Sequence, residues 1–145
     1  MQLAQTLTAI DTLTTTRTST GGASRKRLWA GRIISGLAVA FLTFDTVIKL
    51  VQATPAVEGT VQLGYPASAL LVIGLIEALC LVAYLVPRTA VLGALLWTGY
   101  LGGAIATHLR LGNPLFSHTI FPIYVALLLW GGLYLRDRRV RALIS

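Results

Sequence analysis

The chain has 145 residues, of which 55% are hydrophobic and only 12% are charged, and its mean hydropathy is +0.75. Soluble domains carry about 25% charged residues, so the composition excludes an ordinary soluble domain and predicts a multi-pass membrane protein. The net charge of +7 comes from basic residues beside apolar segments, which indicates topology signals and lipid contacts and not a nucleic-acid partner. The single cysteine excludes an intrachain disulfide and a cysteine metal cage.

The first part of the chain divides into a polar tail and a membrane span. Residues 1–24 are rich in Thr, Ser, Ala and Gly without a sustained apolar period, so the sequence predicts a disordered cytoplasmic tail. Residues 28–51 follow a basic cluster and are long enough to cross the ~30 Å hydrocarbon core. Asp45 and Lys49 form an (i, i+4) pair near the outer end of this span. They either neutralise each other or contribute to a polar pocket.

The second span covers about residues 67–86 and contains one charged residue, Glu77. The preceding loop holds one Glu and no basic residue, which predicts an outer location, a short interfacial helix and Tyr65 at headgroup level. Counting ~1.5 Å per residue from the cytoplasmic ends places Glu77 level with Thr98 and Tyr100, and well below Lys49. We therefore expect Glu77 to meet Thr98 or Tyr100 and not Lys49. Its role is either to fix helix packing or to handle a proton or ligand.

The third span, about residues 89–107, combines apolar side chains with many small ones. A helical face with spacings of four residues predicts close packing against its own neighbours or a partner; this face contains Gly99, Gly102, Gly103 and Ala106. The span exits through His108 and Arg110, which we expect beside Asp45, Lys49 and Tyr65 at the outer rim. The two His residues of the chain are too few for a metal site.

A fourth span covers about residues 118–135 and is followed by a cluster of Arg residues; residues 142–145 are a short C-terminal tail. Most basic residues beside the spans lie on one side, so both termini are expected in the cytoplasm. Because each connection is short, residues 25–141 are predicted to form one all-α domain, a four-helix up-and-down transmembrane bundle.

Several motifs occur between Trp29 and Arg141. They are Lys49, Leu63-Gly64-Tyr65-Pro66, Glu77, Pro87-Arg88-Thr89-Ala90-Val91-Leu92-Gly93-Ala94, Gly99-Tyr100-Leu101-Gly102-Gly103-Ala104 and Thr107-His108-Leu109-Arg110. Together they resemble the DoxX-like family of small four-helix bacterial membrane proteins. The resemblance implies a multi-pass protein of the bacterial inner membrane. The family takes its name from a subunit associated with quinone-linked oxidation of sulfur compounds, whereas most relatives have no established reaction.

Two functions remain open. In the first, the protein is an accessory subunit that binds a small lipophilic molecule such as a quinone in an outer pocket. That pocket is predicted to contain Asp45, Lys49, Tyr65, Glu77, Tyr100, His108 and Arg110. In the second, it is a non-catalytic assembly protein that acts through helix packing with a membrane partner subunit or with copies of itself. No catalytic nucleophile with an adjacent base is evident, so an enzyme acting on its own is not expected.

Overall fold

The computed structural model describes the backbone of residues 2–144 and the side chains of residues 24–142, and this part of the chain is helical without strands. The elements in chain order are α1 (Gln2–Leu50), α2 (Thr54–Gln62), α3 (Ala69–Leu85), α4 (Ala90–Arg110), the π-helix η1 (Leu115–Thr119), α5 (Phe121–Arg136) and α6 (Arg138–Ile144). The predicted all-α class is therefore confirmed.

Three helical segments of the described chain are long and apolar enough to cross a membrane. They are Ser24–Leu50 within α1, Ala90–Arg110, and Leu115–Arg136 across η1 and α5. Helix α3 is the most apolar of the helices but has only 17 residues. At ~1.5 Å per residue it is about 26 Å long, which is slightly less than the hydrocarbon core.

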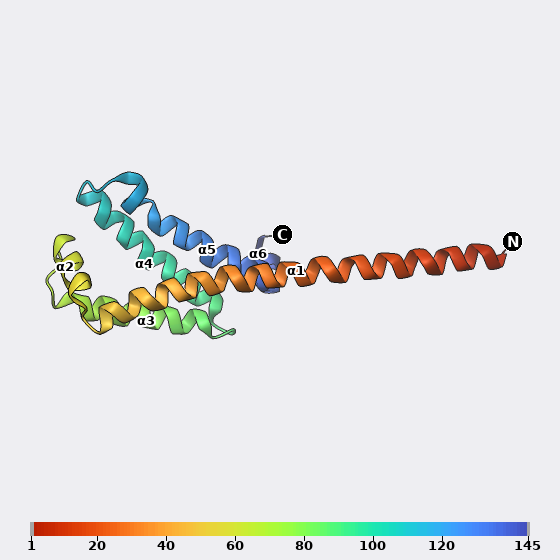
Figure 1. Cartoon of the computed structure of the whole chain (residues 1–145), viewed down its shortest axis with the longest axis horizontal. Helices are drawn as coiled ribbons and strands as arrows, with labels where there is room; N and C mark the ends of the chain where they lie inside the picture. The colour runs from red at the N-terminus through yellow and green to blue at the C-terminus, as the bar shows by residue number, and fades with distance from the viewer. Residues whose placement is uncertain (1, 145) are drawn as a thin grey trace.

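The four apolar helices α1, α3, α4 and α5 each contact two of the others. Helix α1 packs on α3 and α5, and α4 packs on the same two helices. Figure 1 shows them running alongside one another, with α2 and the η1 connection at one end and α6 at the end from which α1 enters. We call the end with α2 and η1 the outer end.

The predicted spans end close to the observed helices, but two terminal segments differ. Helix α1 runs back to Gln2, through the segment for which composition predicts a disordered tail. The side chains of residues 1–23 lie outside those described, and the disordered state stays a prediction. Residues 138–144 form the short helix α6, which reaches into the predicted C-terminal tail of residues 142–145, and Val140 within it is buried. The predicted short helix before the second span is confirmed as α2.

Close helix contacts occur at glycines other than those expected. A Cβ at Gly93 would lie 2.2 Å from the Tyr84 backbone nitrogen, and one at Gly132 would lie 2.4 Å from Ser35 Oγ. These two positions bring α4 against α3 and α5 against α1.

The turn between α3 and α4 contains Pro87, which favours ending α3. The Thr89 hydroxyl donates to the Ala83 carbonyl at 2.8 Å across this turn.

The predicted packing face of α4 does not mediate contact within the described chain. A Cβ at Gly99, Gly102 or Gly103 would meet nothing within 4 Å, and Ala106 is exposed. Spacing of small residues permits a close approach but does not determine which helix makes it, and α3 and α5 contact other faces of α4. Contact of this face with a partner helix stays a prediction.

The core lies toward the end opposite α2 and centres on Tyr84, which is fully buried. Its hydroxyl donates to the Leu129 carbonyl at 3.0 Å and lies 3.3 Å from Ser35 Oγ. A single side chain of α3 thereby ties α1 to α5. This well-packed half holds the helices in register, while the other half encloses the candidate site.

Candidate ligand-binding site

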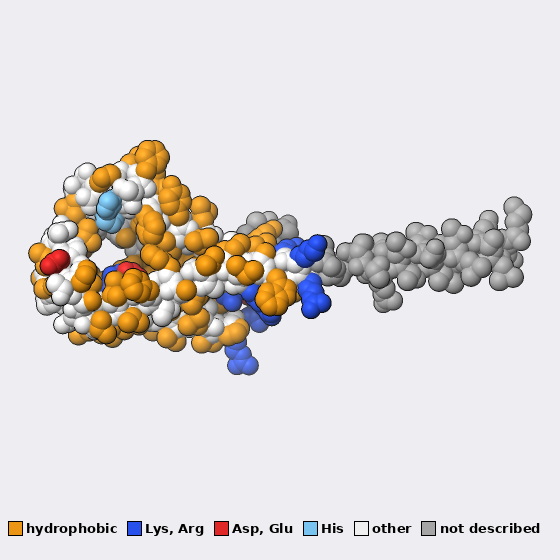
Figure 2. All heavy atoms as spheres, viewed as in Figure 1, with side chains coloured by type: hydrophobic (Ala, Val, Ile, Leu, Met, Phe, Trp, Pro, Cys, Tyr) orange, Lys and Arg blue, Asp and Glu red, His pale blue; other side chains and the backbone are white. Residues whose placement is uncertain are grey.

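A cavity of ≈ 440 Å³ lies in the outer half of the protein. Its walls come from α1, α4 and α5, with Ile73 of α3, and α2 with the following loop borders it. The lining residues are Phe41, Leu42, Asp45, Lys49, Thr60, Leu63, Tyr65, Ile73, Trp97, Gly99, Tyr100, Leu101, Gly103, Ala104, Thr107, His108, Phe121, Pro122 and Val125. Figure 2 shows the described Lys and Arg side chains gathered mainly at the opposite end of the molecule. Most of the lining residues are apolar, and polar side chains are in the minority.

Lys49 forms the centre of the charged part of this site. Its Nζ donates to Asp45 Oδ2 and to Glu77 Oε1, both at 2.5 Å. The Glu77 side chain is completely buried, whereas those of Lys49 and Asp45 are 17% and 31% exposed. One ammonium group therefore lies between two carboxyl groups at the boundary between the cavity and the helix contacts.

The expectation that Lys49 stands too far above Glu77 for an ion pair is wrong. Helix α1 lies against α3 at Gly74, where a Cβ would be 3.2 Å from Lys49 Cβ. Glu77 is less than one helical turn farther along α3 toward the basic end. A helical side chain leans toward the N-terminus of its helix, so Lys49 reaches inward to Glu77 rather than outward to the membrane surface. Counting heights from the cytoplasmic ends missed both the close approach and this direction.

The expectation that Glu77 meets Thr98 or Tyr100 is confirmed, with Tyr100 as the partner. The Tyr100 hydroxyl donates to Glu77 Oε1, which adds α4 to the cluster of Asp45, Lys49 and Glu77. The rings of Trp97 and Tyr100 pack edge to face, with 5.4 Å between their centroids. Thr98 instead donates to the Ala94 carbonyl and accepts a hydrogen bond from Trp130 Nε1 at 2.9 Å. Thr98 therefore faces α5 and not Glu77.

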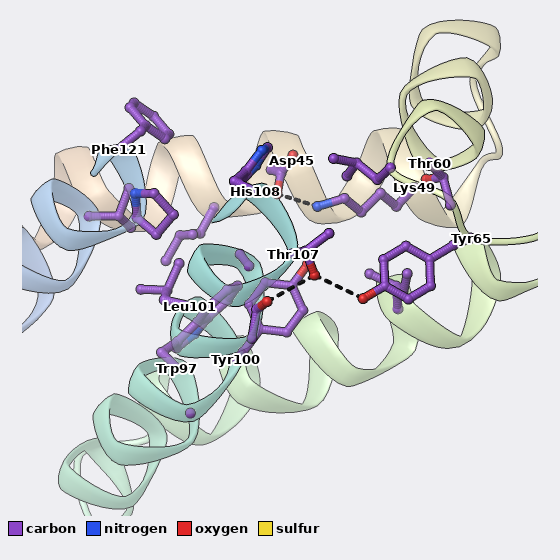
Figure 3. A pocket seen from close by; sticks show the side chains of 18 of the residues that line it. Asp45, Lys49, Thr60, Tyr65, Trp97, Tyr100, Leu101, Thr107, His108 and Phe121 are labelled. Carbon is purple, nitrogen blue, oxygen red and sulfur yellow. Dashed lines mark hydrogen bonds and ion pairs between the residues drawn. The ribbon is translucent and has the colours of Figure 1, made fainter. Parts of the chain in front are cut away.

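A second polar group lies at the outer rim of the cavity. The Tyr65 hydroxyl is 2.9 Å from Thr107 Oγ1, and Thr107 in turn donates to the Gly103 carbonyl (Figure 3). His108 Nδ1 lies 2.9 Å from Asn113 Nδ2. An amide nitrogen only donates, so Nδ1 accepts and the ring proton resides on Nε2, which is left as a donor.

Five of the seven predicted pocket residues line the cavity together: Asp45, Lys49, Tyr65, Tyr100 and His108. The other two support it from outside. Glu77 lies behind Lys49 and Tyr100, and Arg110 donates to the Leu63 carbonyl at 3.1 Å. This bond and the one between Tyr65 and Thr107 fasten the α2–α3 loop to the end of α4.

The pocket residues predicted from sequence include Tyr65 and Tyr100 but not the other three aromatic residues that line the cavity, Trp97, Phe41 and Phe121. Phe41 of α1 and Phe121 of α5 contact each other edge to face at 5.5 Å between centroids. The signal for Trp97 was present in the sequence, since Trp97, Leu101, Ala104 and His108 recur at the spacing of one helical stripe. Membrane spans are apolar on every face, however, so hydrophobic periodicity alone does not separate a cavity wall from a lipid-facing side.

Gly99 and Gly103, which were predicted as part of a helix-packing face, also border the cavity. Neither would bring a Cβ within 4 Å of another side chain or a neighbouring helix. Their missing side chains widen the space between α4 and the rest of the site. Gly102 lies between them in sequence but does not line the cavity.

Comparison with known proteins identifies the family of this chain. The DoxX-like family model matches residues 33–132, from the middle of the first long apolar helix to near the end of α5. No curated protein and no solved structure gives a match. The matched region contains every residue that lines the cavity, and its long apolar helices indicate an integral membrane protein. The chain belongs to the DoxX-like family.

Proposed function

We propose that the protein binds a small lipophilic molecule with hydrogen-bond-accepting oxygens, of which a quinone is the best example, in the outer cavity. It then serves as an accessory subunit of a membrane redox system in the bacterial inner membrane. The observation that carries this proposal is the convergence of Lys49, Tyr65, Tyr100 and His108 on a mainly apolar cavity of ≈ 440 Å³. Ligand sites typically have volumes of about 300–1,000 Å³ and place few polar groups in an apolar lining.

Two of these side chains retain donors that the protein itself does not use. The Lys49 ammonium group has three N–H bonds, and Asp45 and Glu77 accept two of them. His108 Nε2 carries the ring proton, since Nδ1 accepts from Asn113. A quinone carbonyl accepts hydrogen bonds without having to donate any. The free donors therefore favour a ligand with carbonyl oxygens.

The membrane setting of the proposal is a four-helix up-and-down bundle formed by α1, α3, α4 and α5, with both termini in the cytoplasm. Basic residues beside the helix ends support this orientation, because they cluster at the end opposite the cavity (Figure 2). The cavity then lies in the outer half of the bilayer. A lipophilic ligand that partitions into the membrane has a short path to it.

The proposal is tested by filling the cavity from one side. Gly103→Leu places an isobutyl group in the cavity without a clash between helices, because nothing lies within 4 Å of its Cβ. Gly102→Leu is the matched control, since it adds the same group one residue away on the outside of the cavity. Both proteins are titrated in nanodiscs with a short-chain ubiquinone. We expect binding by wild type and Gly102→Leu, and a loss of at least about tenfold in affinity for Gly103→Leu, which corresponds to about 1.4 kcal/mol.

A second function, assembly with a partner helix, is favoured by one observation. Gly102 and Ala106 are exposed on α4 one helical turn apart, which is the spacing of close contacts between membrane helices. If assembly is the function, Gly102→Leu disrupts oligomers or a copurifying subunit, and quinone titration shows no saturable binding by any variant. Size-exclusion chromatography with light scattering measures the first effect.

A further inference from the structure

Trp97 is a buried hydrogen-bond donor without a partner. Its side chain lines the cavity, the residue has 0% exposed surface, and Nε1 has no acceptor among the described residues. The indole group only donates, so rotation cannot turn Nε1 into an acceptor. Burying such a group without a hydrogen bond is unfavourable, and native structures rarely leave one unpaired.

The position of Trp97 distinguishes it from the polar groups at the rim. Figure 3 places Trp97 on α4 on the inner side of Leu101, whereas Tyr65 and Thr107 lie toward the outer end. Tyr100, three residues farther along α4, is already committed to Glu77. Trp130 Nε1, by contrast, has an acceptor in Thr98. Trp97 therefore carries an unused donor beside the inner end of the cavity, among mainly apolar side chains.

We infer that Trp97 Nε1 donates a hydrogen bond to an oxygen of the bound molecule, and so selects an oxygen-bearing ring compound over a hydrocarbon of the same shape. The inference rests on the proposed function, because it needs a ligand in the cavity. It adds the residue that holds the inner end of that ligand. Lys49 and His108 then face its outer end.

The test compares two ligands of the same shape. Duroquinone carries two carbonyl oxygens on a tetramethylated ring, and durene is the same methylated ring without oxygen. Full-length protein in nanodiscs is labelled with ¹⁵N at its three Trp residues, and Trp29→Phe and Trp130→Phe assign the indole N–H signals by elimination. We expect duroquinone to move the Trp97 N–H signal downfield, and durene to leave it without such a shift.

A binding measurement accompanies the spectra. We expect Trp97→Phe to weaken duroquinone binding by about threefold to tenfold, the net worth of one hydrogen bond, and to leave durene binding unchanged. If Trp97→Phe does not fold, the spectra of the wild-type protein carry the test. Duroquinone binding without a downfield shift of Trp97 overturns this inference and leaves the proposed function in place. Binding of neither ligand by wild type overturns both.

Discussion

Replacing Lys49 by methionine removes the cation that neutralises Glu77. The Glu77 side chain is fully buried. Its Oε1 accepts hydrogen bonds from Lys49 Nζ and from the Tyr100 hydroxyl, and its Oε2 has no partner among the described residues. Lys49 is thus the cation that balances this buried carboxylate. Removing one partner of a buried ion pair typically costs about 3–5 kcal/mol, because the remaining charge is left uncompensated. We expect a decrease of that size in the free energy of unfolding of Lys49→Met.

The double variant Lys49→Met, Glu77→Gln separates the ion pair from simple loss of packing. Replacing a buried ion pair by neutral groups of similar shape is often nearly neutral. The second carboxylate beside Lys49, that of Asp45, is 31% exposed and accessible to water, so we expect the double variant to lie within about 1 kcal/mol of wild type. Lys26→Met is the control, because Lys26 is exposed near the basic end. Equilibrium unfolding in mixed micelles with increasing SDS, followed by circular dichroism, measures all four proteins. The reasoning is refuted if Lys49→Met differs from wild type by less than about 0.5 kcal/mol, or if the double variant is no more stable than Lys49→Met.

Two further predictions concern packing and topology. Gly93→Ala forces a methyl group against the Tyr84 backbone, so we expect the free energy of unfolding to fall by about 1–3 kcal/mol in the same assay. Gly36→Ala is the control, because its Cβ has open space around it, and it should be neutral or stabilising by up to about 1 kcal/mol. Equal effects at the two glycines would contradict the close α3–α4 contact. In a cysteine-free background, Glu58→Cys on α2 should react with a membrane-impermeant maleimide in intact cells, and Arg88→Cys only after permeabilisation. The reverse pattern of labelling would refute the cytoplasmic location of both termini.

The helices were predictable from sequence because membrane spans require long apolar runs and their connections carry strong turn signals. Pro87 between α3 and α4 and the Gly112-Asn113-Pro114 segment before η1 are examples. The π-helical geometry of η1 and the helix α6 were not predicted. Both are short, and neither has a composition that separates it from a loop or tail.

The sequence predicted which residues lie at the candidate site better than it predicted which of them contact each other. Topology alone brings Asp45, Lys49, Tyr65 and His108 to one end of the helices, and the cavity collects all four. The pairing of Lys49 with Glu77 depended on how closely α1 approaches α3 and on where a long side chain leans. Neither the distance between two helices nor the direction of a side chain can be calculated from helix lengths.

The most direct test of the central claim is native mass spectrometry of the protein released from nanodiscs that contain a quinone. Wild type and Gly102→Leu are predicted to retain one quinone per protein chain, and Gly103→Leu to retain none. Equal retention by Gly103→Leu and wild type would show that the ligand binds outside the cavity. No quinone on any of the three proteins would contradict the proposed function itself.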